Sequence, residues 1–158
     1  MTPLVWTNWT GPEKGLANLT QELLSWEGTP YSSGQMVKQS GIDCVRLLVS
    51  VIVALRKTNP LTIPTLSPDA SINNPTKARM VIQYLLDLIS PTKLDSNEVQ
   101  PGDMLVSYTG PEEGHVYIVG FKPGTVWHAD NFAGVRFTGI ANVGIVKNIY
   151  RDPLRESW

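Results

Sequence analysis

The stretch GIDCVRLLVSVIVALRK, residues 41–57, holds the most apolar run of the chain and its single cysteine, Cys44. Asp43 precedes that run, and aspartate is favoured as a helix N-cap because its carboxylate accepts a hydrogen bond from an unpaired backbone N–H of the first turn. Apolar residues fill most positions from Val45 to Leu55, as in a helix that is buried on most sides. The stretch therefore predicts a buried helix over residues 44–57, capped by Asp43.

Two further helices are indicated on either side of it. Asn18 and Gln21 have the spacing of a capping box, which predicts a helix from residue 19 that stops at Gly28. Residues 58–76 carry four prolines and few periodic apolar positions, so we expect a long Pro-rich surface insertion there. A third helix is predicted over about 77–89, ended by Pro91.

The second half of the chain has the pattern of strands. Short β-prone runs are separated by Gly, Pro and Asn turns, and they cover residues 104–108, 115–121, 125–129, 134–138 and 143–150. Helices followed by strands with hairpin-length links predict an α+β fold in which N-terminal helices pack on a C-terminal antiparallel sheet. With neither an internal repeat nor a linker, residues 1–158 are expected to form one domain.

Composition restricts the partners. The chain has 42% hydrophobic and 17% charged residues and a formal net charge of −1, with Lys and Arg scattered. Such a balance gives no electrostatic basis for binding nucleic acid or an anionic membrane. The apolar run 45–55 is interrupted by Arg46 and is too short to span a bilayer. The first residues also lack the pattern of a secretory signal, so we expect a chain that is cytoplasmic as synthesised and that reaches other places by another route, lysis or assembly into a particle.

Cys44 is the candidate nucleophile. Unpaired N–H groups in the first turn of a helix favour a thiolate, so this position is expected to lower the pKa of a cysteine. The chain has two histidines, His115 and His128, each at one end of a predicted strand. A hairpin can set the two imidazoles side by side, with His115 as general base and His128 orienting it. Taken one by one, the cysteine would be a core residue and each histidine a half-exposed strand residue.

Two other chemistries remain open on the residues alone. One cysteine and two histidines could hold zinc with an open position, but HExxH, CxxC and closely spaced ligands are missing. We therefore expect neither a metal nor a cofactor. The Tyr31 hydroxyl could donate a hydrogen bond to an oxyanion, but on the residues alone we interpret Tyr31 as a packing residue.

Several segments together resemble the NlpC/p60 family of cell-wall cysteine peptidases. They are Gly28-Thr-Pro-Tyr31-Ser-Ser-Gly34, Gly41-Ile-Asp-Cys44, Val99-Gln-Pro-Gly-Asp-Met-Leu-Val106, Gly114-His-Val-Tyr-Ile-Val119, Val126-Trp-His-Ala129 and Gly134-Val. They occur in the order found in that family, and the resemblance covers about residues 19–149. The most specific part is the combination of the GIDC turn with the downstream PGD and GHV segments.

The resemblance implies a papain-like fold and a cysteine peptidase or amidase that cleaves amide bonds in peptidoglycan stem peptides through a thioester. Residue by residue, it implies Cys44 as nucleophile, His115 as base and His128 as the residue that orients the base. Tyr31 matches the tyrosine near the nucleophile, and Asp43 matches the acidic residue before it. Cys44 precedes both histidines, an order that favours a peptidase over the circularly permuted acyltransferase-like relatives.

Two departures from the family pattern motivate an alternative. Val45 and Arg46 stand where the family has small residues, so Arg46 could narrow the cleft, bind a substrate carboxylate or face solvent. The insertion at 58–76 lengthens the separation between cysteine and histidine. The chain also resembles stand-alone members encoded with phage tail genes. The alternative function is therefore a phage tail-tip or assembly component that keeps the fold for binding tail proteins or wall peptides, with weak or no catalysis, and that resides in the virion or at the cell wall.

Overall fold

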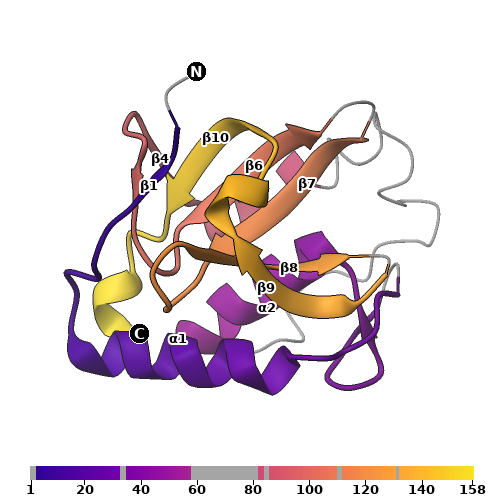
Figure 1. Ribbon diagram of the computed structural model, residues 1–158. Helices are drawn as coiled ribbons and strands as arrows, with labels where there is room; N and C mark the ends of the chain where they lie inside the picture. Colours follow the sequence, from indigo (N-terminus) through magenta and orange to yellow (C-terminus); the bar gives the residue numbers. More distant parts are fainter. Residues whose placement is uncertain (1–2, 33–34, 58–81, 84–85, 110–111, 131) are drawn as a thin grey trace.

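Figure 1 shows the computed structural model, in which two helices lie beneath a larger β-sheet. The structure describes residues 3–32, 35–57, 82–83, 86–109, 112–130 and 132–158. Its elements, in chain order, are β1 (Val5–Trp6), α1 (Glu13–Trp26), β2 (Met36–Val37), β3 (Gly41–Ile42), α2 (Cys44–Leu55), β4 (Thr92–Leu94), β5 (Glu98–Val99), β6 (Met104–Thr109), β7 (Glu112–Val119), β8 (Thr125–Asp130), β9 (Gly134–Gly139), the 3₁₀ turn η2 (Ile140–Asn142), β10 (Ile145–Arg151) and the 3₁₀ turn η3 (Arg155–Ser157).

The main sheet has six strands in the order β4-β10-β6-β7-β8-β9, and every pair of neighbours is antiparallel. Its β6-β7-β8-β9 portion is a meander whose strands match the β-prone runs of the sequence, and β10 returns to pair with β6. Two small pairs, β1 with β5 and β2 with β3, lie outside this sheet. The predicted α+β class with an antiparallel sheet is confirmed.

Helix α2 lies between α1 and the sheet, where it contacts β7 and β8 (Figure 1). Apolar side chains around most of its circumference are buried, as the near-continuous apolar sequence predicts, and only the side with Ser50 and Ala54 is partly open. The buried side chains share one core with Leu19 and Leu23 of α1 and with Val116 and Ile118 of β7. Each fully buried aliphatic side chain contributes roughly 1.5–3 kcal/mol to the free energy of unfolding. The packing of α2 therefore fixes where its first residue, Cys44, lies relative to β7.

The predicted start of the first helix, at Asn18, is wrong. α1 begins at Glu13, after Pro12, and ends at Trp26. The extra turn contains Gly15, where an added Cβ would lie 2.9 Å from the Trp9 ring and 3.4 Å from Cβ of Trp158. Close packing against two tryptophans thus explains a glycine that reads, in sequence, as a helix breaker.

Residues 82–83 and 86–89 are helical, within the range predicted for the third helix. The rest of that prediction and the whole Pro-rich insertion at 58–76 lie outside the described residues. Among the helices that the structure describes, none has the length and apolarity needed to cross a membrane.

Candidate active site

Cys44 is the first residue of α2, and Asp43 caps that helix as predicted. The backbone N–H of Arg46 donates to Oδ1 of Asp43 over 2.8 Å. This capping places Cys44 in the first turn, where backbone N–H groups point outward without helical partners. The residue as a whole is only 1% exposed.

The loop that carries Tyr31 lies beside Cys44. Tyr31 forms a β-bridge with Ile42, and the Ile42 N–H donates to the Pro30 carbonyl over 3.1 Å. On its other side, the loop is bound to β9 through the Val135 N–H, which donates to the carbonyl of Thr29 over 2.9 Å. The Tyr31 hydroxyl oxygen is buried. Tyr31 is therefore held beside Ile42, two residues before Cys44, in a loop that is also bound to the start of β9.

His115 and His128 come together as the hairpin prediction requires. Nε2 of His115 lies 2.7 Å from Nδ1 of His128, so one ring nitrogen donates to the other. His115 lies on β7 and His128 on β8, and these two strands pair antiparallel. Tyr117 contacts both rings, with centroid distances of 4.7 Å to His115 and 4.9 Å to His128. The aromatic contacts hold the two imidazoles in a fixed mutual orientation.

Cys44 contacts β7, the strand that carries His115. Its thiol forms a hydrogen bond with the backbone of Val116, the residue that follows His115. The structure thus brings Cys44, His115, His128, Tyr31 and Asp43 into one region at the N-terminus of α2. Thiol, imidazole and second imidazole are the components of a cysteine–histidine nucleophilic site.

The protonation states differ from the expectation of a helix-stabilised thiolate. Burial, together with the negative charge of Asp43, raises the pKa of the Cys44 thiol to about 12. Burial and the neighbouring His128 lower the pKa of His115 to about 4, against a smaller opposite effect of Asp130. Desolvation disfavours both charged forms and outweighs the helix N-terminus. At neutral pH the resting pair is therefore a neutral thiol and a neutral imidazole.

Arg46 does not face solvent, which excludes one of its three predicted roles. It is 3% exposed, and its Nη1 forms an ion pair with Oδ2 of Asp43. Its Nη2 is buried and has no hydrogen-bond partner in the part of the chain that the structure describes. Arg46 neutralises Asp43 from within the first turn of α2, and a role in binding a substrate carboxylate stays a prediction.

Two polar residues near the histidines were not predicted. Oδ2 of Asp130 lies 3.8 Å from Nε2 of His128 and 2.7 Å from Nε of Arg136. Alternation along β8 puts Asp130 on the same face as His128, two residues earlier. That signal was present in the sequence, but the predicted strand ended at Ala129, one residue short. Arg136 is the register partner of His128 on β9.

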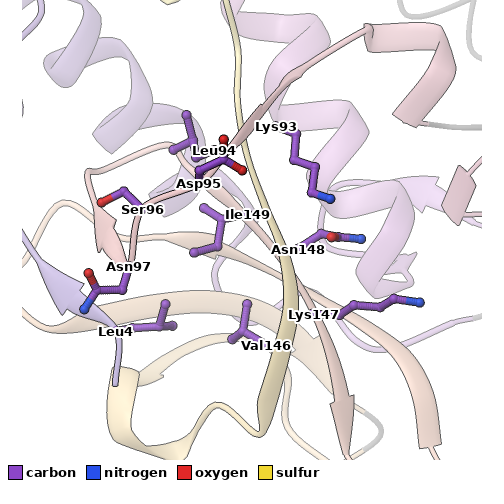
Figure 2. A pocket seen from close by; sticks show the side chains of 10 residues that line it. All are labelled: Leu4, Lys93, Leu94, Asp95, Ser96, Asn97, Val146, Lys147, Asn148 and Ile149. Atoms are coloured by element: carbon purple, nitrogen blue, oxygen red, sulfur yellow. The ribbon is translucent and has the colours of Figure 1, made fainter. Parts of the chain in front are cut away.

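Among the described residues, no group of three or more His, Cys, Asp or Glu side chains could hold a metal ion. A hollow of about 570 Å³ lies elsewhere, at the β4–β10 edge of the sheet (Figure 2). Leu4, residues 93–97 and residues 146–149 line it. In the strand order β6 lies between β10 and β7, so the hollow does not belong to the site around Cys44.

Comparison with known proteins places these features in a family context. No family model matches the chain. The chain is 28% identical over 137 residues to the "probable endopeptidase NlpC" of Escherichia coli, covering 86% of this chain and 75% of that protein. The NlpC/p60 domain of the peptidoglycan hydrolase SagA superposes with a TM-score of 0.55 at 19% identity, covering 85% of this chain and 96% of that one.

A second solved structure, a lipoprotein-like protein of the NLP/P60 family from Staphylococcus aureus, superposes with a TM-score of 0.57 at 17% identity. It matches 92% of this chain and 43% of its own length. The similarity of fold extends over nearly the whole chain, and the similarity of sequence to a curated relative extends over most of it. The predicted resemblance is therefore confirmed: the chain is similar in sequence to an NlpC endopeptidase and in fold to solved structures of the NlpC/p60 family.

Proposed function

We propose that this chain is a peptidoglycan hydrolase that cleaves amide bonds in stem peptides with Cys44 as nucleophile. The observation that carries the proposal is the 2.7 Å contact between His115 and His128 beside the strand that the Cys44 thiol touches. The curated relative is a probable endopeptidase and one structural relative is a peptidoglycan hydrolase, which supports the substrate class.

The proposed reaction starts from neutral groups. Sγ of Cys44 attacks the amide carbonyl carbon while its proton passes to the free ring nitrogen of His115, Nδ1. The negative charge moves to the carbonyl oxygen, where the Tyr31 hydroxyl is proposed to donate a hydrogen bond. His115 then returns the proton to the leaving amine, and the C–N bond breaks to give a thioester. Water activated by His115 hydrolyses the thioester and restores the thiol.

His128 is proposed to orient the base. With a hydrogen on His115 Nε2, that nitrogen donates to His128 Nδ1, and the lone pair of His115 is then on Nδ1. Because the ground state is uncharged, proton transfer must accompany attack rather than precede it. A general base that is neutral at physiological pH suits this order of events.

The test is cleavage of purified disaccharide-peptide fragments, with mass spectrometry of the products. The wild-type chain is expected to release a peptide with a new amine, and Cys44→Ala and His115→Ala are each expected to abolish release. Cys44 is the single cysteine of the chain, so alkylation of the wild type with iodoacetamide provides a second, mutation-free way to block the same atom. Wild-type turnover by Cys44→Ala would overturn the mechanism, provided thermal unfolding shows that the variant folds.

One observation favours a second candidate, a component that keeps the fold for binding with weak or no catalysis. Cys44 is 1% exposed, so a substrate carbonyl reaches Sγ only if neighbouring groups move. This candidate predicts binding of stem peptides without cleavage, measured by calorimetry next to product analysis. Location in a phage tail is part of this second proposal, and the genes flanking this one provide its test.

A further inference from the structure

Asp130 has two sets of contacts, one on each carboxylate oxygen. Oδ1 accepts from the backbone N–H groups of Phe132 and Ala133, over 2.8 and 2.6 Å, which fixes the turn after β8. Oδ2 faces Nε of Arg136 at 2.7 Å and Nε2 of His128 at 3.8 Å. The turn uses only Oδ1, so the charge on Oδ2 acts on Arg136 and on His128.

His128 Nε2 is the second observation. The residue is 8% exposed, and this ring nitrogen is buried with no hydrogen-bond partner among the described residues. Oδ2 of Asp130 lies 3.8 Å from this nitrogen, beyond hydrogen-bonding distance. A buried N–H beside a carboxylate is favourable, whereas a buried lone pair beside a carboxylate is repelled.

We propose that Asp130 is a positioning residue that selects the tautomers of both histidines. Its charge favours hydrogen on Nε2 of His128, which leaves Nδ1 of His128 as an acceptor. Across the 2.7 Å contact, His115 must then donate from Nε2, and its own Nδ1 carries the lone pair. Through the series Asp130–His128–His115, Nδ1 of His115 is kept unprotonated, so that it can act as the base toward the Cys44 thiol. The catalytic part of this inference rests on the proposed function, but the tautomer part does not.

Asp130→Asn is the informative variant. Asparagine can still accept the two backbone hydrogen bonds of the turn through its carbonyl oxygen, while the amide NH₂ replaces the charged oxygen that faces His128. Donation from that NH₂ favours a lone pair on His128 Nε2 and reverses the order, so His115 Nδ1 carries hydrogen. Arg136→Gln is the matched control, because it removes the exposed cation that pairs with Asp130 and leaves the carboxylate beside His128.

The direct measurement is long-range ¹H–¹⁵N NMR of the two histidine side chains at pH 7, which reports the protonated nitrogen of each ring. Two histidines in the chain make assignment by His128→Gln straightforward. The wild type and Arg136→Gln are expected to have hydrogen on Nε2 of both rings. Asp130→Asn is expected to shift His115 toward hydrogen on Nδ1, and to lower kcat on disaccharide-peptides by about 10- to 100-fold with little change in KM.

The outcomes separate this inference from the function. Unchanged histidine spectra in Asp130→Asn would overturn it, whatever happens to the rate, because any loss would then come from the turn. A changed spectrum with wild-type kcat would overturn the positioning role. If the wild type cleaves nothing but Asp130→Asn changes the tautomers, the proposed function fails and the tautomer selection stands.

Discussion

At the scale of the residue, Cys44 is subject to two opposing effects. The first turn of α2 offers backbone N–H groups, which stabilise a thiolate. Burial and the adjacent Asp43 stabilise the neutral thiol, and they prevail, since the pKa rises to about 12. Asp43 thus serves α2 as a cap while it opposes ionisation of the next residue. Arg46 offsets part of that charge through its ion pair with Asp43.

The raised pKa predicts how Cys44 reacts with iodoacetamide. Only the thiolate is alkylated, so the rate rises with pH until the thiol is ionised. An ordinary cysteine, with a pKa of about 8.5, reaches its plateau near pH 10. For Cys44 we expect the rate to be still rising at pH 10, measured by mass spectrometry on the intact protein. A plateau near pH 8.5 would contradict the neutral resting thiol.

In the same experiment, Asp43→Asn distinguishes the effect of the Asp43 charge on the pKa of Cys44 from the effect of how easily iodoacetamide reaches the thiol. Asparagine caps a helix as well as aspartate does, but the variant removes the negative charge that raises the pKa of Cys44. Its pH profile is expected to move to lower pH, whereas a change in access alone would scale the rate equally at all pH values. Asp95→Asn, at an exposed aspartate, is the control and should leave the profile unchanged.

At the scale of the element, the turn before β9 decides where the Tyr31 loop lies. Gly134 has a φ of +71°, and a Cβ there would lie 2.1 Å from the carbonyl oxygen of Thr29. The backbone of Thr29 cannot yield as a flexible side chain would, because it is hydrogen-bonded to Val135. The glycine therefore permits both the turn and the close approach of the loop.

We predict that Gly134→Ala destabilises the protein more than Gly124→Ala. Gly124 has the same φ of +71°, but no atom lies within 4 Å of its Cβ position. Both variants carry the strain of a left-handed alanine, about 1 kcal/mol, and only Gly134→Ala adds the clash, worth a further 1–3 kcal/mol or so. Urea unfolding of the two variants measures the difference. Equal losses would show that the loop shifts without cost.

Elements differ in how well the sequence predicts them, and the reasons are physical. α2 was predicted correctly because its cap and its apolar run are local signals. The first turn of α1 was missed, since its stability depends on Gly15 packing against Trp9 and Trp158, which are distant partners. β4 and the small pairs β1–β5 and β2–β3 have two or three residues each, too short for a period to appear.

The residues of the candidate site differ in the same way: local sequence patterns predict some of their positions, and packing of distant segments decides others. The pairing of His115 with His128 follows from a hairpin whose strands and turn are visible in sequence. The exclusion of Arg46 from solvent follows from how α2 packs, which no local pattern reveals. Asp130 lay one residue beyond the predicted end of its strand, so a small error at a strand boundary concealed its position on the face of His128.

At the scale of the whole molecule, one buried carboxylate connects the two ends of the chain to the core. Asp152 accepts two hydrogen bonds from Arg56, which follows α2, and one from the indole N–H of Trp158. Trp158 stacks on Trp9 ahead of α1 at a centroid distance of 5.8 Å. In Figure 1 the C-terminal turn accordingly lies beside the start of α1. This cluster holds α1, α2 and the end of β10 in one arrangement.

We therefore expect Asp152→Asn to lower the free energy of unfolding by about 2–4 kcal/mol at pH 7, because it leaves the Arg56 guanidinium without its counter-charge. Asp152 is 1% exposed; burial alone would raise its pKa, but hydrogen bonds from Arg56, Leu154 and Trp158 lower it. A carboxylate with a lowered pKa contributes stability above its unfolded pKa of about 3.9 and loses that contribution as the pH falls through the folded value.

The difference in stability between the wild type and Asp152→Asn should consequently be full at pH 6–7 and shrink as the pH falls below about 4. Urea unfolding at a series of pH values measures it. The matched control is again Asp95→Asn, whose exposed carboxylate should change the stability by no more than about 0.5 kcal/mol. A difference that stayed constant down to pH 2 would mean that Asp152 acts through shape and hydrogen bonding alone. Its charge would then not be what joins α2 to the C-terminal turn.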